Sequence, residues 1–193
     1  MKYINILLYE NFTTLDVFGP VDVFGRLEDY KIRFISLPGG NISNKQGVTI
    51  HTEAAETAAE GDILMVPGGF GSRTIINDEN FIKMLKKLAE LSSHVLCVCT
   101  GSALLAKTGL LDGKTATSNK SSFDWVKGFG NNVDWKRQAR WTSDGKYYTS
   151  AGVSAGIDMA LGFVEDRYGK ERAEKIAKAM EYHWNTDKDH DIF

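Results

Sequence analysis

Apolar residues follow two different spacings along this chain, and segments of the two kinds alternate. Densely apolar segments of strand length occupy residues 3–9, 31–36, 48–51, 62–66, 94–98 and 115–117. Apolar residues recur every three or four positions, as on one face of a helix, over residues 14–24, 80–92, 123–129, 153–168 and 170–182. This alternation predicts an α/β fold, a mostly parallel sheet sandwiched by helices with ligands at the carboxyl ends of the strands.

Glycine and proline residues refine these boundaries. Gly19-Pro20 lies inside the first predicted helix and is expected to bend or restart it. Residues 48–51 follow two glycine turns and are expected to form a short edge strand. The polar segment 143–146 between two aromatic segments predicts a β-hairpin. Gly169 is expected to end the helix before it.

Length, charge and cysteine content limit the possible functions. The 193 residues fit one domain, residues 1–193, around a single core. A net charge of -2 without long runs of one sign gives no electrostatic case for nucleic acid or an anionic membrane as partner. No apolar run approaches membrane-spanning length. Cys97 and Cys99 are expected on the same strand face, at a spacing that suits neither a disulfide nor zinc. These features predict a cytoplasmic protein without metal or cofactor.

Cys99 lies where an apolar strand runs directly into a helix of small residues. At such a turn the side chain is held out of the sheet, and the free N–H groups at the start of the helix favour thiolate over thiol. This placement predicts a cysteine nucleophile. The alternative that the local sequence leaves open is a buried structural cysteine.

Two other segments should meet Cys99 at the carboxyl edge of the sheet. Gly68 and Gly69 follow another strand, and their N–H groups, with that of Thr100, are candidate oxyanion donors. A plain tight turn is the equal alternative for the two glycines. Asp16, in the first turn of the first helix, is by itself a solvated acid that complements the helix dipole. Placed beside Cys99, it would share a proton with the thiol.

A second motif competes with the cysteine. Residues 152–156, Gly-Val-Ser-Ala-Gly, match the G-x-S-x-G sequence of serine hydrolases. A catalytic Ser154 requires an acid and then a histidine later in the chain. The nominal candidates are Asp158 or Glu165 with His183 or His190. Both acids lie on the same predicted helix as Ser154, whereas the acid should follow a later strand, so Ser154 is favoured as a helix cap.

Together these segments resemble the ThiJ/PfpI superfamily, whose fold is flavodoxin-like and similar to that of class I glutamine amidotransferases. The resemblance spans nearly the whole chain. Within the superfamily, the chain is most similar to the branch that contains isonitrile hydratase and the amidase-like domains of certain transcription regulators. The motifs that carry the resemblance lie in residues 7–24, 66–69, 98–102, 109–114 and 150–158.

The resemblance implies a function for the cysteine site. Cys99 would be the nucleophile, Asp16 the acid or base beside it and Thr100 a supporting residue. By analogy, the thiolate would add to the carbon of a small molecule such as an isonitrile, and water would release an N-substituted formamide. The expected protein is a homodimeric, cysteine-dependent hydratase or amidase-like enzyme. Its candidate oxyanion and substrate-binding residues are Gly68, Gly69, Asn119 and Ser154.

Two positions depart from relatives, and other functions stay open. The protease-like branch has a histidine directly after the nucleophile, where this chain has Thr100, which argues against peptidase activity of that type. Many relatives of the hydratase branch have a histidine where this chain has Asn119, which can hydrogen-bond a substrate but cannot relay a proton. The alternatives are a redox or electrophile sensor without turnover, a protease- or amidase-related hydrolase, and a module that binds a ligand without chemistry.

Overall fold

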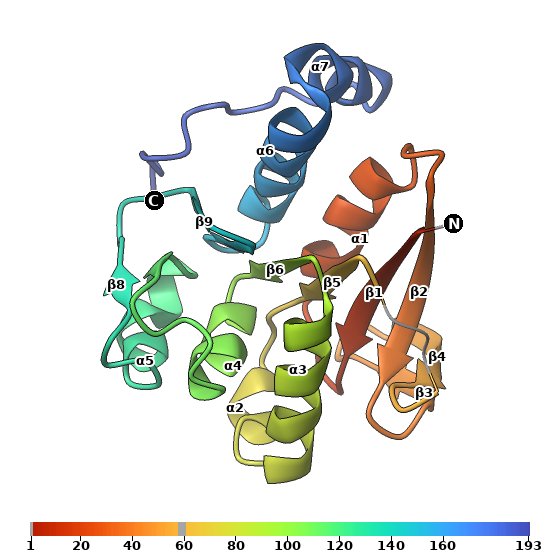
Figure 1. Ribbon diagram of the computed structural model, residues 1–193, viewed down its shortest axis with the longest axis vertical. Helices are drawn as coiled ribbons and strands as arrows, with labels where there is room; N and C mark the ends of the chain where they lie inside the picture. Colours follow the sequence, from red (N-terminus) through yellow and green to blue (C-terminus); the bar gives the residue numbers. More distant parts are fainter. Residues whose placement is uncertain (1, 58–60) are drawn as a thin grey trace.

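An eight-stranded sheet forms the centre of the protein (Figure 1). The structure, a computed structural model, describes residues 2–57 and 61–193. The strand order is β3-β4-β2-β1-β5-β6-β10-β9, and only the two edge strands, β3 and β9, run antiparallel to their neighbours. The predicted mostly parallel sheet is therefore confirmed. The strands are β1 (Lys2–Leu8), β2 (Tyr30–Ser36), β3 (Gly40–Ser43), β4 (Thr49–Ala54), β5 (Ile63–Val66), β6 (His94–Val98), β9 (Trp141–Asp144) and β10 (Tyr147–Ser150).

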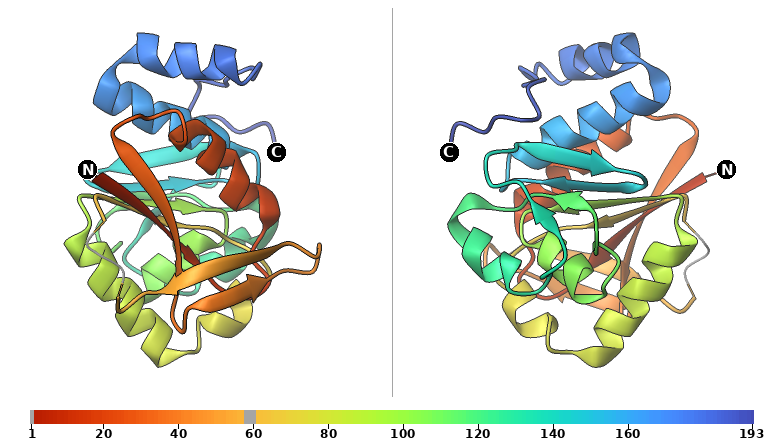
Figure 2. Two further views of the ribbon diagram at one scale, coloured as in Figure 1. Left: turned by 90° about the vertical axis from the view of Figure 1, so that its right-hand side faces the viewer. Right: turned by 60° about the vertical axis from the view of Figure 1, so that its left-hand side comes forward.

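Helices cover both faces of this sheet, as Figure 2 shows in its right-hand view. One face carries α1, α6 and α7, and the other carries α2, α3, α4 and α5. The predicted sandwich is thus confirmed, with α2 as an additional short helix. The helices are α1 (Thr14–Phe24), α2 (Ser72–Ile75), α3 (Glu79–Leu91), α4 (Gly101–Lys107), α5 (Phe123–Lys127), α6 (Ala155–Tyr168) and α7 (Lys170–Ala179).

The central strands are apolar on both sides because each side faces helices. In β1, Ile6 and Leu8 belong to the core beneath α1 and α6, whereas Leu7 belongs to the core beneath α3 and α4. All three side chains have no exposed surface. Burial of such a side chain contributes roughly 1.5–3 kcal/mol. Packing on both faces holds the strands in this order, and the order places the ends of β1, β5 and β6 next to one another at the carboxyl edge.

The strand predicted at residues 48–51 is present but is not at the edge. It is β4, which pairs in parallel with β2 on one side and antiparallel with β3 on the other. A turn at Asn44 folds β3 back, because the Asn44 carboxamide oxygen accepts the N–H groups of Gln46 and Val48, each at 3.1 Å. The apolar pattern did not predict β3 because Ile42 is its one apolar residue.

Gly19-Pro20 does not restart the first helix, so the prediction of a restart was wrong. Helix α1 continues through Pro20 to Phe24. Helix α6 crosses α1 closely at this point, since a Cβ on Gly19 would lie 2.7 Å from the Ile157 side chain. Packing against α6 offsets the cost of a proline inside the helix.

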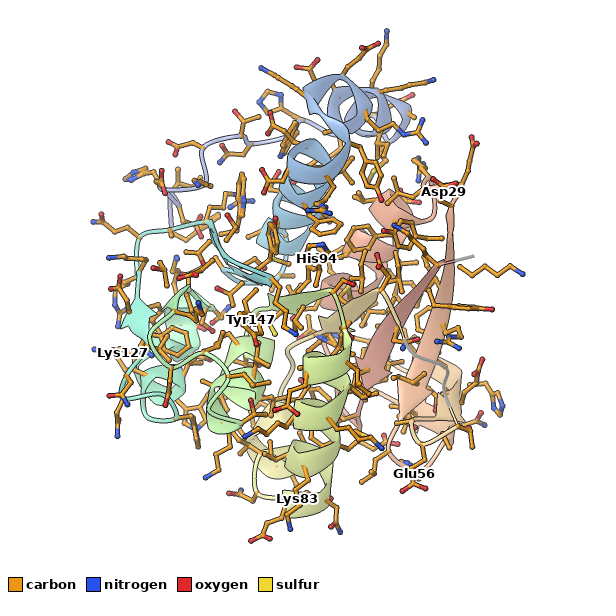
Figure 3. All side chains as sticks on the ribbon, viewed as in Figure 1. Asp29, Glu56, Lys83, His94, Lys127 and Tyr147 are labelled. Atoms are coloured by element: carbon orange, nitrogen blue, oxygen red, sulfur yellow. The ribbon has the colours of Figure 1, made fainter. Side chains whose placement is uncertain are left out.

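Other local predictions had mixed outcomes. The hairpin of β9 and β10 is confirmed, and Gly169 ends α6 with a positive φ of 86°. The strand predicted at residues 115–117 is β7 (Thr115–Ala116), but it pairs with β8 (Asp134–Trp135) in a separate two-stranded sheet. His94, at the start of β6 and so at the opposite edge from Cys99, packs its ring 5.2 Å from that of Phe163 in α6 (Figure 3).

Candidate active site

Cys99 occupies the sharp turn between β6 and α4, as the sequence predicts. Its φ of 57° lies in the left-handed region, which costs a non-glycine residue about 1–3 kcal/mol. The loop after β5 approaches this turn closely, because a Cβ on Gly68 would lie 2.8 Å from the Cys99 Cβ and 2.6 Å from the Thr100 nitrogen. A glycine is therefore required at position 68 to bring the two strand ends together.

The two cysteines do not share a face of the sheet, contrary to the sequence-based expectation. Cys97 belongs to the core on the α4 side, whereas Cys99 belongs to the core on the α1 and α6 side. Cys99 lies beyond the last residue of β6, and its left-handed backbone breaks the alternation of a strand. Both thiols are free, and 6% of the Cys99 side chain is exposed against none of Cys97.

Asp16 lies beside Cys99 and is not the solvated acid that its position in the first turn suggests. Its side chain has no exposed surface. The Gly68 N–H donates to Asp16 Oδ2 at 2.9 Å. The other oxygen, Oδ1, is buried without a hydrogen-bond partner, and the Cys99 thiol lies close enough to the carboxyl group to lower its pKa. The structure therefore brings together the thiol and the carboxyl group that the resemblance paired.

Burial dominates the acid–base behaviour of this pair. It raises the pKa of Asp16 to about 7, although hydrogen bonds from the Gly68 amide and the Cys99 thiol lower this pKa. It also raises the pKa of Cys99 above its ordinary value, and the negative charge of Asp16 raises it further. The amides of Thr100 and Val153 and the Thr100 hydroxyl lower it by less. The expected preformed thiolate is thus replaced by a thiol that shares its proton with a nearby carboxylate.

Thr100 and the two glycines form a hydrogen-bonded support under this pair. The Gly69 N–H donates to Thr100 Oγ1 at 3.0 Å, and the Ser72 hydroxyl donates to the same oxygen at 3.0 Å. The N–H groups of Gly68 and Gly69 are therefore already engaged by Asp16 and Thr100. In this arrangement the glycines hold side chains in place, and the donors at the sulfur are the amides of Thr100 and Val153 and the Thr100 hydroxyl.

The G-x-S-x-G segment contributes a backbone group and not a hydroxyl. Val153 has a positive φ of 50°, and its N–H faces Cys99. Ser154 precedes α6 without making the predicted side-chain capping bond. The nominal acid Asp158 is held by Arg140 at 2.6 Å and accepts from the Tyr182 hydroxyl at 3.1 Å. Asp158 is thus committed to a structural ion pair, which argues against a serine triad.

A residue that the sequence did not single out also contacts the turn at Cys99. The Ser118 hydroxyl donates to the Cys99 carbonyl oxygen at 2.8 Å and is fully buried. Its neighbour Asn119 accepts the Ser122 N–H at 3.0 Å and packs against Gly152, where a Cβ would lie 2.1 Å from Asn119 Nδ2. The segment after β7 therefore forms one wall of the site, although nothing in its composition indicates this.

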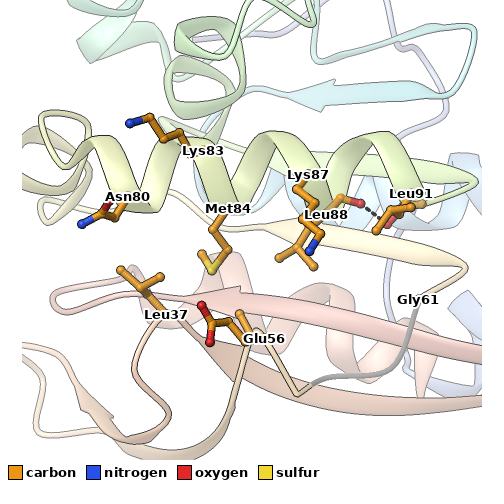
Figure 4. A pocket seen from close by; sticks show the side chains of 11 residues that line it. Leu37, Glu56, Gly61, Asn80, Lys83, Met84, Lys87, Leu88 and Leu91 are labelled. Carbon is orange, nitrogen blue, oxygen red and sulfur yellow. Dashed lines mark hydrogen bonds between the residues drawn. The ribbon is translucent and has the colours of Figure 1, made fainter.

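The groove along α3 in Figure 4 is separate from these residues. It has a volume of about 550 Å³ and is lined by residues such as Leu37, Met84 and Leu88, with none of the site residues named above. Across residues 2–57 and 61–193, no group of three or more histidine, cysteine and acidic residues is arranged to hold a metal ion.

Comparison with known proteins identifies the family of the chain. Residues 2–166 match the DJ-1/PfpI family. The chain belongs to the DJ-1/PfpI family. Among curated relatives, isonitrile hydratase of Pseudomonas putida is 31% identical over 180 residues, which cover 93% of this chain and 78% of that protein. A solved ThiJ/PfpI family protein from Pseudomonas syringae superimposes with a TM-score of 0.86 at 29% identity, covering 95% of this chain and 76% of that one.

This DJ-1/PfpI chain also resembles regulators. The HTH-type transcriptional regulator CdhR of Pseudomonas aeruginosa is 28% identical over 150 residues, and the chain spans 44% of its length. The structure of Drosophila melanogaster DJ-1beta, at 23% identity and a TM-score of 0.81, shares the fold. No helix within the described parts of this chain is long and apolar enough to cross a membrane.

Proposed function

We propose that the protein hydrates a small isonitrile to an N-substituted formamide, with Cys99 as nucleophile and Asp16 as the acid and base. The observation that carries this proposal is the buried pair itself. Asp16 has no exposed surface, its pKa is raised to about 7, and Cys99 lies beside it. A carboxyl group that is half protonated at neutral pH can both give and accept a proton during one turnover.

The addition step uses both groups at once. The isonitrile carbon takes the proton of Asp16 and forms a bond to the Cys99 sulfur, while the thiol proton passes to Asp16. The product is a thioimidate, R–N=CH–S, attached to Cys99. No separate thiolate has to form beforehand, which suits a thiol whose pKa is raised by burial. The amides of Thr100 and Val153 stabilise the charge that develops on sulfur.

The second half of the reaction releases the product. Water adds across the C=N bond, with hydrogen going to nitrogen and the hydroxyl to carbon. The carbon–sulfur bond then breaks, the hydroxyl becomes the formyl oxygen, and its proton returns to the sulfur. In sum, R–NC and water give R–NH–CHO, and both residues regain their starting protonation. Thr100 acts as a positioning residue, since its hydroxyl accepts from Gly69 and Ser72.

The alternatives fit the site less well. A redox sensor relies on a thiolate with a lowered pKa, because oxidation follows thiolate character. Here burial and Asp16 both raise the pKa of Cys99. A peptidase of the family's protease-like type would have a histidine at position 100, where this chain has threonine. An isonitrile needs one proton at carbon and one nucleophile, which this pair supplies.

Turnover of a simple isonitrile tests the proposal directly. Tert-butyl isonitrile is incubated with the protein, and the formamide is followed by proton NMR. We expect many formamide molecules per protein, with turnover abolished in Cys99→Ala. Cys97→Ala is the matched control because Cys97 lies on the other face of the sheet, and it should retain activity. Absence of turnover in the natural sequence, or its survival in Cys99→Ala, would contradict the proposal.

We further place this reaction in the cytoplasm of the cell and in a homodimer. The two free cysteines suit a reducing compartment. Leu15 and Phe18 on α1, flanking Asp16, are exposed apolar side chains that a second copy would cover. Light scattering at micromolar concentration should give twice the mass of the chain, and a monomer mass would contradict the dimer.

A further inference from the structure

Two cationic side chains flank an exposed aromatic ring next to the site. Phe70 directly follows the glycine pair, and 66% of its surface is exposed. Lys45 Nζ lies 4.7 Å from the centre of the Phe70 ring, and the Arg73 guanidinium lies 5.5 Å from it. Lys45 comes from the turn between β3 and β4, whereas Arg73 belongs to α2. Two distant segments therefore bring positive charge to one side of the cysteine site.

Arg73 is held by three contacts. Besides Phe70, its guanidinium lies 4.6 Å from the centre of the Trp125 ring. Its Nη2 donates to the Ser122 hydroxyl at 3.2 Å. A guanidinium stacked between two rings has lost most of its freedom before any ligand binds, so little further ordering is needed on binding.

Arg73 connects two segments that both contact residues beside Cys99. On one side, its neighbour Ser72 donates to Thr100 Oγ1 at 3.0 Å. On the other side, Ser122 donates its N–H to Asn119, which packs against the glycine before Val153. The guanidinium therefore connects α2 to the segment after β7, and both of these segments contact residues beside Cys99.

The positive charge of Arg73 has no acidic partner within 4 Å in the described ranges of the chain. By contrast, Arg26, Arg137 and Arg140 each pair with an aspartate. A guanidinium offers five N–H donors in a planar fork that matches a carboxylate, and Ser122 engages one of its nitrogens. Arg73 is thus a preorganised cation with donors to spare, next to residues that contact the turn at Cys99.

We propose that Arg73 binds the carboxylate of the substrate, so that Cys99 acts on small isonitriles that carry an anionic group. This inference rests on the proposed function for the identity of the reacting group. Phe70 packs against the apolar part of the substrate, and Lys45 adds a second, more flexible positive charge.

A pair of probes that differ in charge alone tests this selectivity. Isocyanoacetate carries a carboxylate, and its methyl ester is neutral. We expect the natural sequence to favour isocyanoacetate in kcat/KM by roughly 10- to 100-fold, the value of one charged hydrogen-bonded contact. Arg73→Gln should remove this preference through a higher KM for isocyanoacetate, with kcat for the methyl ester retained. Equal kcat/KM for the two probes in the natural sequence would overturn the inference.

Two further variants separate recognition from folding. Arg73→Lys keeps the charge and should recover part of the preference for isocyanoacetate. Arg137→Gln is the matched control, because Arg137 also stacks on a ring, that of Phe123 at 4.7 Å, but is paired with Asp124. It should leave the preference unchanged. An equal loss of activity toward both probes in Arg73→Gln would indicate a structural role and contradict the inference.

Binding without turnover distinguishes this inference from the proposed function. N-formylglycine, the product expected from isocyanoacetate, and its methyl ester are titrated by calorimetry into Cys99→Ala, which cannot react. If no isonitrile is turned over, but N-formylglycine binds and Arg73→Gln abolishes this binding, the carboxylate site stands and the proposed reaction fails. If N-formylglycine binds no better than its ester, the carboxylate site is wrong whatever the reaction.

Discussion

Two aspartates of this protein, Asp16 and Asp158, are equally buried and differ in almost everything else. Neither has exposed surface, and burial raises the pKa of both. Asp158 receives Nε of Arg140 at 2.7 Å, with the Tyr182 hydroxyl and the Asn185 N–H on its other oxygen. Asp16 accepts one backbone N–H, that of Gly68, while its Oδ1 is buried without a hydrogen-bond partner and the Cys99 thiol lies beside the carboxyl group.

The number of hydrogen-bond partners decides whether a buried carboxyl group is available for chemistry. A fully satisfied carboxylate such as Asp158 is a structural anchor, because its charge and lone pairs are already used. It ties the segment after α7 to the sheet through Arg140, which also bonds to Asp191 at 3.0 Å. Within residues 2–57 and 61–193 no cationic side chain pairs with Asp16, and burial raises its pKa to about 7. The unpaired oxygen of Asp16 therefore supports the proposal that Asp16 is the acid and base of the site.

Replacement of Asp16 by asparagine should have the largest effect on activity. The asparagine can still accept the Gly68 N–H, so the fold is retained, but it can neither give nor take a proton. We expect kcat/KM for a small isonitrile to fall about 10²- to 10⁴-fold, the usual contribution of a general acid or base. Steady-state kinetics, with circular dichroism to confirm folding, measures this, and a fall below threefold would contradict the assignment.

Replacement of Asp158 by asparagine should lower the stability of the protein and leave its activity nearly unchanged. It removes one of the carboxylates that pair with the buried Arg140, so we expect the free energy of unfolding to fall by about 3 kcal/mol. This is the low end for a broken buried pair, because Asp191 still bonds to Arg140. Urea denaturation gives the stability, and kinetics well below the midpoint should show nearly natural turnover. A stable but inactive Asp158→Asn would reverse the roles of the two aspartates.

The pH dependence of stability should also depend on Asp16, because its pKa changes on folding. The pKa of Asp16 rises from 3.8 to about 7 on folding, so between these values the folded state holds a proton that the unfolded state has lost. Stability therefore falls as pH rises from about 4 to 7, by at most about 4 kcal/mol. Asp16→Asn removes this loss, and in the difference between variant and natural sequence the contribution of Asp158 cancels.

The measurement is the stability of Asp16→Asn minus that of the natural sequence at pH 5, 6, 7 and 8. We expect this difference to increase with pH by 1 kcal/mol or more and to level off above about pH 7. Asp158→Asn is measured in parallel to detect a general electrostatic effect. A difference that is flat with pH would show that Asp16 titrates as an ordinary surface acid.

The sequence predicted the sheet, its helical layers and the turn at Cys99, because continuous apolar segments and a strand-to-helix junction are local signals. It could not predict the burial of Asp16, since an acid in the first turn of a helix is normally solvated. Burial follows from the approach of Gly68, which lies 52 residues away in the chain. The contact of Ser118 with Cys99 could not be predicted for the same reason, because it depends on where the segment after β7 folds back.

The predicted thiolate illustrates a competition between two effects. The N–H groups at the start of a helix do favour the charged form, and the Thr100 amide lowers the pKa of Cys99 as expected. Burial and the neighbouring Asp16 act in the other direction and prevail. Similarly, the G-x-S-x-G motif marked a real strand-to-helix junction, but the group it presents to the site is the Val153 amide.

Alkylation of Cys99 by iodoacetamide as a function of pH tests the central claim, that Asp16 and Cys99 titrate as one coupled pair. Peptide mass spectrometry follows Cys99, with buried Cys97 in the same peptide as the unreactive control. We expect a reaction midpoint above the ordinary value of about 8.5 in the natural sequence, and a midpoint lower by one pH unit or more in Asp16→Asn, which removes the opposing charge. An unchanged midpoint in Asp16→Asn would contradict the coupling and with it the proposed chemistry.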